Sequence, residues 1–327
     1  MSKKALITGI SGQDGSYLAK LLDDKGYTIH GITRGIHSNL YRLEFLGIKN
    51  KVKFHECDLA NKEEVNSLLE EIEVDEVYNL AAQSSVGYSF SIPQKTFEFN
   101  TKSVTNLLEG IRSVRPKTRF YQASSSEMFG NVSMQSLPIK ESLLFHPVSP
   151  YGISKASAHW LAVNYREAYN LYTACGILFN HESCLRGENF VIKKIINTAL
   201  RIKNGTVDEL TLGNLAVKRD WGYAPKYVEA MWLSLQQENP DDYIVCSGNL
   251  SSLQEIVVKV FEQLDLDLYQ YIRLDPMLMR SLDLSIIYGD NGKAKKQLSW
   301  DYNITTNELI RKLVEDEKSW INWKGTN

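Results

Sequence analysis

The chain has 327 residues, which is long enough for one large domain or two unequal lobes. A formal net charge of -2, with 43% hydrophobic and 23% charged residues, is typical of a globular protein and argues against a basic nucleic-acid-binding surface. The sequence has no apolar run of the roughly 18 residues that a membrane span needs. Its four cysteines lack the spacing of a zinc site or a disulfide framework. We therefore expect a cytoplasmic protein with no metal, no membrane partner and no nucleic-acid partner.

The first half of the chain alternates short apolar segments with amphipathic ones, which is typical of β–α–β units and a parallel sheet. The predicted strands are Lys4–Thr8, Thr28–Thr33, Val52–Glu56, Glu76–Leu80, Arg119–Ala123 and Thr173–Leu178. The predicted helices are Gly15–Lys25, Lys62–Glu71, Pro93–Val114 and Tyr151–Tyr169. This order predicts an α/β fold with a doubly wound, Rossmann-type parallel sheet over residues 1–180.

From residue 181 to 327 the alternation is less regular. Short apolar segments are found at Glu209–Leu212 and Asp242–Cys246. The predicted helices around them are Phe190–Lys203, Lys226–Gln236, Leu253–Leu264 and Thr306–Trp323. We expect a smaller, mixed α/β substrate lobe, with some segments crossing between the lobes. Because ligands of open α/β sheets bind outside the carboxyl ends of the strands, the cleft should lie between the two lobes.

A glycine-rich loop follows the first predicted strand and opens the first helix, which is the context of a dinucleotide-binding fold. The loop reads Gly9-Ile10-Ser11-Gly12-Gln13-Asp14-Gly15, a GxxGxxG spacing. Glycines at these positions allow a tight turn and close approach of backbone N–H groups to a pyrophosphate. The helix N-terminus then faces the anion. We expect Gly9, Ser11, Gly12, Gln13, Asp14 and Gly15 to bind the cofactor.

The end of the second strand predicts which dinucleotide is bound. An acidic residue there would bind the ribose 2′-hydroxyl, whereas an arginine accommodates a 2′-phosphate. The sequence has Arg34 and no acid at this point, which favours NADP, with NAD still possible. Asp58 and Leu59, after the third strand, should meet the adenine. The segment after the fourth strand should run under the pyrophosphate and ribose, through Leu80, Ala81 and Ala82.

The candidate catalytic residues form a YxxxK pair and a serine cluster. Tyr151 and Lys155 are one helical turn apart on the same face, so the ammonium should lower the pKa of the phenol. The tyrosine could then accept a hydroxyl proton while a hydride leaves the same carbon. The serine cluster, Ser124-Ser125-Ser126, directly follows the fifth predicted strand, and Ser125 is its best candidate to hydrogen-bond the reacting hydroxyl. Tyr151 and Lys155 should also lie beside the nicotinamide.

Glu127 is two residues beyond Ser125 and suggests chemistry beyond oxidation. Oxidising a sugar at C4 acidifies the hydrogen at C5, and a carboxylate can remove that proton. The same group can help expel the C6 hydroxyl as water. A simple 4-epimerase needs no carboxylate at this place.

Taken together, these motifs resemble those of the GDP-mannose 4,6-dehydratases, which belong to the extended short-chain dehydrogenase/reductases. The resembling segments run from Ala5 to about Trp300 and include ALITGISGQDGSYLAKLL, DEVYNLAAQSSVGYSF, FYQASSSEMFG, ILFNHES, RGENFV and KRDWGYAPKYVEAMW. The resemblance implies a GDP-sugar substrate and a homodimer or homotetramer. It assigns Ser125, Glu127, Tyr151 and Lys155 as the catalytic set. It assigns as substrate-binding residues Gln83, Ser84, Ser85, Asn180, Lys194, Arg219 and Arg280.

Two departures from the family pattern leave alternatives open. Gly35 stands where the family usually has a second arginine, and the family's RPxEVD segment becomes RSLDLS at residues 280–285. The substrate could therefore be GDP-mannose or a related GDP-hexose, heptose or amino sugar. The alternatives to dehydration are a reaction that ends at C4 as oxidation, epimerisation or reduction, and a cofactor-binding sensor without turnover.

Overall fold

The computed structural model describes residues 2–33, 35, 39–278 and 284–326. Its centre is a parallel seven-stranded sheet in the order β10-β6-β5-β4-β1-β2-β3. The strands are β1 (Lys4–Thr8), β2 (Thr28–Thr33), β3 (Val52–Glu56), β4 (Glu76–Asn79), β5 (Arg119–Ser125), β6 (Thr173–Leu178) and β10 (Asp242–Val245). The strand order reverses between β1 and β4, and ligands of such sheets bind at this switch point. The predicted Rossmann-type fold is confirmed.

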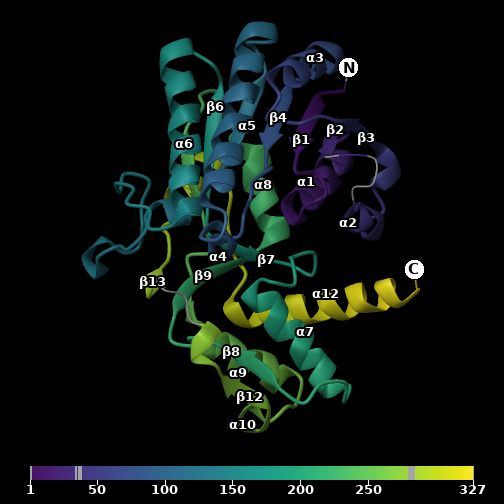
Figure 1. Ribbon diagram of the computed structural model, residues 1–327, viewed down its shortest axis with the longest axis vertical. Helices are drawn as coiled ribbons and strands as arrows, with labels where there is room; N and C mark the ends of the chain where they lie inside the picture. The colour runs from purple at the N-terminus through teal and green to yellow at the C-terminus, as the bar shows by residue number, and fades with distance from the viewer. Residues whose placement is uncertain (1, 34, 36–38, 279–283, 327) are drawn as a thin grey trace.

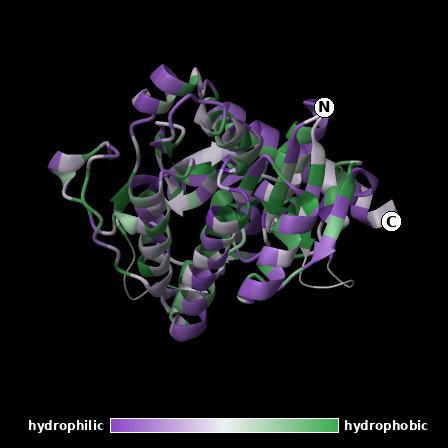
Figure 2. Cartoon of the chain, turned by 90° about the horizontal axis from the view of Figure 1, so that it is seen from above, coloured by the Kyte–Doolittle hydropathy of each residue, from purple (hydrophilic) through white to green (hydrophobic). Residues whose placement is uncertain are grey.

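Helices cover both faces of this sheet (Figure 1). One layer is formed by α3 (Lys62–Ile72), α5 (Pro93–Val114) and α6 (Pro150–Tyr169), and the other contains α1 (Gln13–Asp24) and α8 (Ala224–Ser234). With both faces covered, the strands are almost entirely buried, as in other parallel sheets, except for the edge strand β3. Figure 2 shows the hydrophobic colour along the central strands and much of the hydrophilic colour on the outer turns of the helices. Among the described helices, none combines the length and apolar character that a membrane crossing requires.

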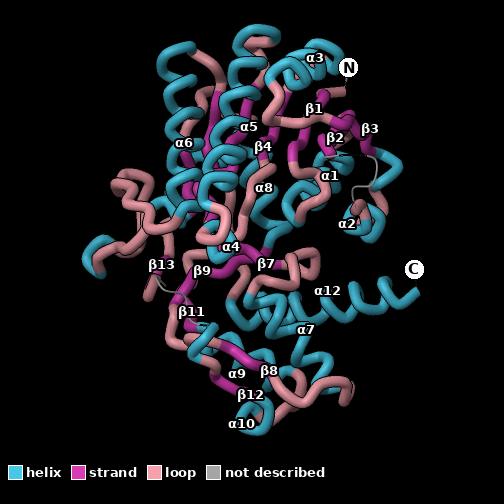
Figure 3. The backbone as a smooth tube through the Cα atoms, viewed as in Figure 1, coloured by secondary structure: helices cyan, strands magenta, loops and turns pink. Residues whose placement is uncertain are grey.

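The rest of the chain forms a second body of helices and short strands below the carboxyl edge of the sheet (Figure 3). Its helices are α7 (Val191–Lys203), α9 (Leu253–Gln263), α10 (Leu268–Tyr271) and α12 (Thr306–Thr326). One small sheet contains β7 (Asn180–Glu182), β9 (Lys218–Tyr223), β11 (Leu250–Ser252) and β13 (Ile286–Ile287), and another pairs β8 (Leu210–Leu212) with β12 (Ile272–Leu274). Three further short helices contact the part of the chain that contains the large sheet: α2 (Tyr41–Phe45) contacts α1, α4 (Val86–Ser89) contacts α6, and α11 (Gly292–Leu298) contacts α8 and β10.

One segment of the second half returns to the large sheet. The strand β10 pairs in parallel with β6, and α8 packs on α1 and β6. We therefore propose two lobes whose boundary near residue 180 is crossed by the segment from Ala224 to Val245. The short polar strands β7 and β9 were not predicted, because neither has the apolar run or the alternation that marks a strand in sequence.

Two element boundaries differ from prediction at the cleft. Helix α1 begins at Gln13, two residues early, because Gly15 packs in its first turn against the loop before it. A Cβ at Gly15 would lie only 2.3 Å from the Gly9 carbonyl oxygen. Strand β5 continues through Ser124 to Ser125, where it still pairs with Leu178 of β6. Ser125 therefore belongs to the rigid sheet and not to the loop that follows it.

A pair of histidines in β2 and β3 makes stability depend on pH. Nδ1 of His30 lies 2.8 Å from Nε2 of His55, and the rings stack with centroids 5.1 Å apart. Burial, together with the neighbouring His55, lowers the pKa of His30 from 6.5 to about 4. The unfolded chain therefore binds the proton first, and stability should fall as the pH drops from about 6.5 towards 4.

We expect His30→Gln to lose less stability on acidification than the wild type. Melting temperatures at about pH 7.5 and about pH 5 would show a difference of a few degrees between the two proteins. His146→Gln, at an exposed histidine, should behave like the wild type. Equal losses in all three proteins would contradict this prediction.

Candidate active site

The glycine loop is held against the end of β4 at the switch point. Gly9 has φ +68°, and a Cβ there would lie 3.0 Å from the Ala81 nitrogen, so a side chain would separate the two segments. The Thr8 hydroxyl accepts hydrogen bonds from the backbone N–H groups of Leu80 and Ala81, both at 3.0 Å. The loop therefore presents its backbone and the N-terminus of α1 to one cavity, a geometry that suits a pyrophosphate.

This cofactor cavity has a volume of about 1010 Å³. It is lined by the predicted residues Gly9, Ser11, Gly12, Gln13, Asp14, Gly15, Asp58, Leu59, Leu80, Ala81 and Ala82. Arg34, on which the NADP prediction depends, lies outside the described residues. The glycine cradle, the helix N-terminus and the size of the cavity fit a dinucleotide.

Two residues that were not predicted contribute to this region. Nε2 of His181, in β7, lies 2.9 Å from the Asp14 carboxylate. Burial by itself would raise the pKa of Asp14, but the charge of His181 and its hydrogen bond lower it to about 2. Arg186 lines both the cofactor cavity and the cavity beside it. In the sequence, the polar segment after β6 could have indicated these two residues. Only the fold shows that this segment faces the glycine loop.

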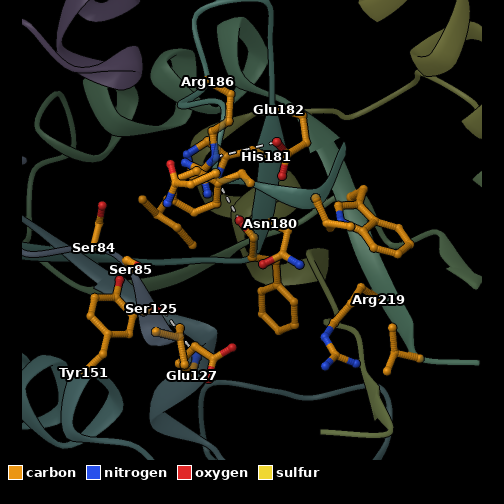
Figure 4. A pocket seen from close by; sticks show the side chains of 18 of the residues that line it. Ser84, Ser85, Ser125, Glu127, Tyr151, Asn180, His181, Glu182, Arg186 and Arg219 are labelled. Atoms are coloured by element: carbon orange, nitrogen blue, oxygen red, sulfur yellow. Dashed lines mark hydrogen bonds and ion pairs between the residues drawn. The ribbon is translucent and has the colours of Figure 1, made fainter. Parts of the chain in front are cut away.

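The adjoining substrate cavity has a volume of about 360 Å³ and contains all four predicted catalytic residues. Of the predicted substrate residues, it is lined by Ser84, Ser85, Asn180, Lys194 and Arg219. In Figure 4, Ser85, Ser125 and Glu127 lie near Tyr151, whereas His181, Glu182 and Arg186 lie on the opposite side of the view. The candidate catalytic side chains therefore lie together in one part of the cavity, and a second group of polar side chains lies around Arg186.

Two of the predicted substrate residues are not placed in this cavity. Gln83 is not among its lining residues, because Nε2 of Gln83 donates to the Ser85 carbonyl at 3.1 Å and so turns the side chain into its own loop. The Gln83 backbone is held in turn by Asn100 of α5. Gln83 therefore supports the loop that carries Ser84 and Ser85. Arg280 lies outside the described residues.

The surroundings of Tyr151, the candidate catalytic tyrosine, shift its pKa in the direction opposite to the one expected. Tyr151 is buried, and this burial raises its pKa to about 12, although a hydrogen bond to Ser125 acts to lower it. Lys155 donates to the Ala123 carbonyl at 2.6 Å, and its Nζ is 5.9 Å from the centre of the Tyr151 ring. Burial also lowers the pKa of Lys155 to about 8. We predicted that Lys155 lowers the pKa of Tyr151. For the free protein this prediction is wrong.

Glu127 follows β5 in a single 3₁₀ turn formed by Ser126–Met128. The Glu127 backbone N–H donates to the Ser125 hydroxyl at 3.3 Å, which caps this turn. The cap places a carboxyl group and a hydroxyl group at the wall that also carries Tyr151. Such a wall has the groups needed to move protons at two neighbouring carbon atoms.

Cationic side chains line another part of the substrate cavity. Nζ of Lys194 donates to the Thr211 carbonyl at 2.7 Å, and Nη1 of Arg219 donates to the Lys218 carbonyl at 2.9 Å. Figure 4 shows Arg219 well away from Tyr151, across Asn180. Charges held in this way suit a diphosphate. The fold and site together define a class, the nucleotide-sugar-modifying enzymes of the extended short-chain dehydrogenase/reductase type.

Comparison with known proteins narrows this class. A family model described as GDP-mannose 4,6 dehydratase matches residues 6–313. GDP-mannose 4,6 dehydratase 1 of Arabidopsis thaliana is 44% identical over 326 residues, covering 96% of this chain and 90% of that protein. The human GDP-mannose 4,6 dehydratase is 39% identical, covering 95% of this chain and 90% of that protein. The chain belongs to the GDP-mannose 4,6-dehydratase family.

Solved structures share the fold. A UDP-glucose 4-epimerase from Thermotoga maritima has a TM-score of 0.86 at 22% identity, covering 97% of this chain and 99% of that one. A dTDP-glucose 4,6-dehydratase from Bacillus anthracis, in complex with NAD, has a TM-score of 0.85 at 21% identity, covering 98% of both chains. RMD from Pseudomonas aeruginosa, complexed with NADPH, has a TM-score of 0.80 at 23% identity, covering 97% of this chain and 100% of that one.

Proposed function

We propose that this protein is a GDP-sugar 4,6-dehydratase that uses a nicotinamide cofactor. The observation that carries the proposal is the presence of Glu127 in the cavity that also contains Ser125, Tyr151 and Lys155. The names of the curated relatives agree with this chemistry. The substrate would be GDP-mannose or a related GDP-hexose or heptose, and the product its 4-keto-6-deoxy form.

Each catalytic side chain has a separate task. Ser125 hydrogen-bonds the C4 hydroxyl, and Tyr151 accepts the proton of that hydroxyl. Glu127 removes the C5 proton that oxidation has acidified and assists departure of the C6 hydroxyl as water. When bound, a nicotinamide would supply hydride chemistry, as the acceptor of the C4 hydride and its donor to C6. The proton that Tyr151 takes from the C4 hydroxyl balances the proton that C5 regains in that last step. Lys155 holds its ammonium group under the end of β5, at the Ala123 carbonyl.

The raised pKa of Tyr151 sets a condition for this mechanism. With a pKa of about 12, the phenol is protonated at neutral pH. It becomes a base only when positive charge or stronger hydrogen bonding reaches it in the loaded site. The hydrogen bond to Ser125 and the charge of Arg186 already act in that direction, and the positive charge of an oxidised nicotinamide would add to them. The ternary complex should therefore be more reactive towards the C4 hydroxyl than the free protein suggests.

The proposal that the cofactor is NADP depends on Arg34. Loss of a charge-assisted contact to phosphate in Arg34→Ala is expected to weaken NADP binding by about tenfold, with a much smaller effect on NAD. Fluorescence titration of cofactor-depleted protein with NADPH and NADH measures this difference. Equal affinity of Arg34→Ala and wild type for NADPH would contradict the role of Arg34.

We also propose that the protein works as a cytoplasmic homodimer or homotetramer. The outer surfaces of α5 and α6 carry large exposed apolar side chains, with Phe97 45%, Ile153 45% and Trp160 57% exposed. An association between two copies would cover such side chains. All four cysteines are buried free thiols, which suits a reducing compartment.

Incubation with GDP-mannose tests the proposed reaction. The expected product has lost one water and is a 4-keto-6-deoxy sugar, which mass spectrometry and NMR identify. A product that keeps its C6 oxygen would show that the reaction ends at C4 and would overturn the dehydratase assignment. GDP-heptose should be tried under the same conditions, because either substrate would satisfy the proposal.

A further inference from the structure

The corner of the cofactor cavity beyond β2 contains an acidic group that comes from the next strand. Glu56 ends β3 and pairs in parallel register with Thr33, the last residue of β2, and both residues line the cofactor cavity. A Cβ at Gly35 would lie 3.4 Å from Oε1 of Glu56. The Glu56 carboxylate therefore reaches the place just past the end of β2.

Among the residues that the structure describes, Glu56 is the acid of this cavity for which no partner is found. Asp14 is bound to His181, and Asp58 accepts the Ala60 N–H at 2.9 Å. Glu64 accepts the Asp58 N–H at 2.7 Å and the Asn61 amide at 2.8 Å. Within the described residues, the Glu56 carboxylate makes no hydrogen bond and no ion pair. It is therefore available to a ligand.

The described arginines that line the cofactor cavity are held away from Glu56. Arg42 donates to the Ser11 carbonyl at 3.0 Å and to the Leu185 carbonyl at 2.7 Å, beside the glycine loop. Arg186 lies where the cofactor cavity meets the substrate cavity. Both arginines therefore suit the pyrophosphate and the nicotinamide half of a dinucleotide. Gly35 has no side chain with which to add positive charge near Glu56.

We infer that Glu56 faces the 2′ position of the adenosine ribose and favours NAD over NADP. A carboxylate accepts a hydrogen bond from a 2′-hydroxyl, whereas a 2′-phosphate in its place would bring two negative charges against a third. The acid that binds the 2′-hydroxyl in NAD-binding folds usually stands at the end of β2, and here Glu56 supplies it from β3. Its negative charge opposes the attraction of Arg34 for a 2′-phosphate. This inference rests on the proposed binding of a nicotinamide dinucleotide, but not on dehydration.

The test compares cofactor binding by wild type and Glu56→Gln, which keeps the size of the side chain and removes its charge. Titration of cofactor-depleted protein with NADH and NADPH, followed by nicotinamide fluorescence, gives two dissociation constants for each protein. We expect the ratio of affinities to move towards NADPH by about tenfold in Glu56→Gln. Glu56→Lys should move it further in the same direction.

Glu63→Gln is the matched control. Glu63 is exposed and lies in the surface hollow that also contains Glu56, but it does not line the cofactor cavity. Its substitution changes the net charge equally and should leave the ratio at the wild-type value. A ratio in Glu56→Gln that stays within about twofold of wild type would overturn the inference.

Binding and turnover separate the two proposals. If Glu56→Gln shifts the cofactor ratio in a protein that fails to dehydrate GDP-sugars, the inference stands and the dehydratase proposal fails. If the protein dehydrates GDP-mannose but the ratio does not shift, the dehydratase proposal stands and the role of Glu56 fails.

Discussion

Tyr151→Phe is expected to lower turnover by about 10²–10⁴-fold while cofactor binding persists, because only the proton acceptor is lost. The ring remains, so the packing of this buried side chain at the start of α6 is retained. Single-turnover formation of reduced cofactor from bound GDP-sugar measures the affected step directly. A variant with near-normal turnover would show that Tyr151 is not the base.

The raised pKa of Tyr151 makes the pH profile a second readout for this prediction. A phenol with a pKa of about 12 gains activity as it is deprotonated, so the wild-type rate should rise with pH if the loaded site lowers that pKa only in part. The residual rate of Tyr151→Phe should not follow this rise. If both proteins show the same profile, the titrating group lies elsewhere.

Glu127→Gln is expected to oxidise the bound sugar but to release almost no 6-deoxy product. Removal of the C4 hydride uses Tyr151 and Ser125, whereas elimination needs a further proton acceptor at C5. The amide keeps the size and the hydrogen bonding of the glutamate but is not a carboxylate base, so dehydration should fall by about 10²–10⁴-fold. Reduced cofactor should then accumulate and be visible by its near-ultraviolet absorbance.

Two controls make this prediction specific. In the wild type, the reduced cofactor is consumed within each cycle and should not build up. Glu182→Gln removes a different buried acid of the same cavity, one that lies beside His181 and Arg186 and away from Tyr151. It should still complete dehydration. If Glu182→Gln accumulates reduced cofactor and Glu127→Gln does not, the assignment of the base to Glu127 is wrong.

The features that the sequence predicted well are those that depend on neighbouring residues. Four strands of the large sheet, β1, β2, β3 and β6, were predicted with their observed ends, and β4 and β5 were predicted within two residues of theirs. Buried parallel strands show as short apolar runs, and glycines needed for a tight turn show as a spaced motif. The pairing of Tyr151 with Lys155 likewise follows from the pitch of one helix.

What the tertiary structure decided is which distant segments meet and how deeply charged groups are buried. The strand β10 joins the sheet beside β6, and the short polar strand with His181 reaches the glycine loop, because these contacts close long loops that leave no local pattern. The position of Glu56 next to Gly35 follows from the register of β2 and β3, and no spacing along the chain predicts it. The pKa values of Tyr151 and Lys155 likewise depend on the desolvation of a cavity that forms only when both halves of the chain fold together.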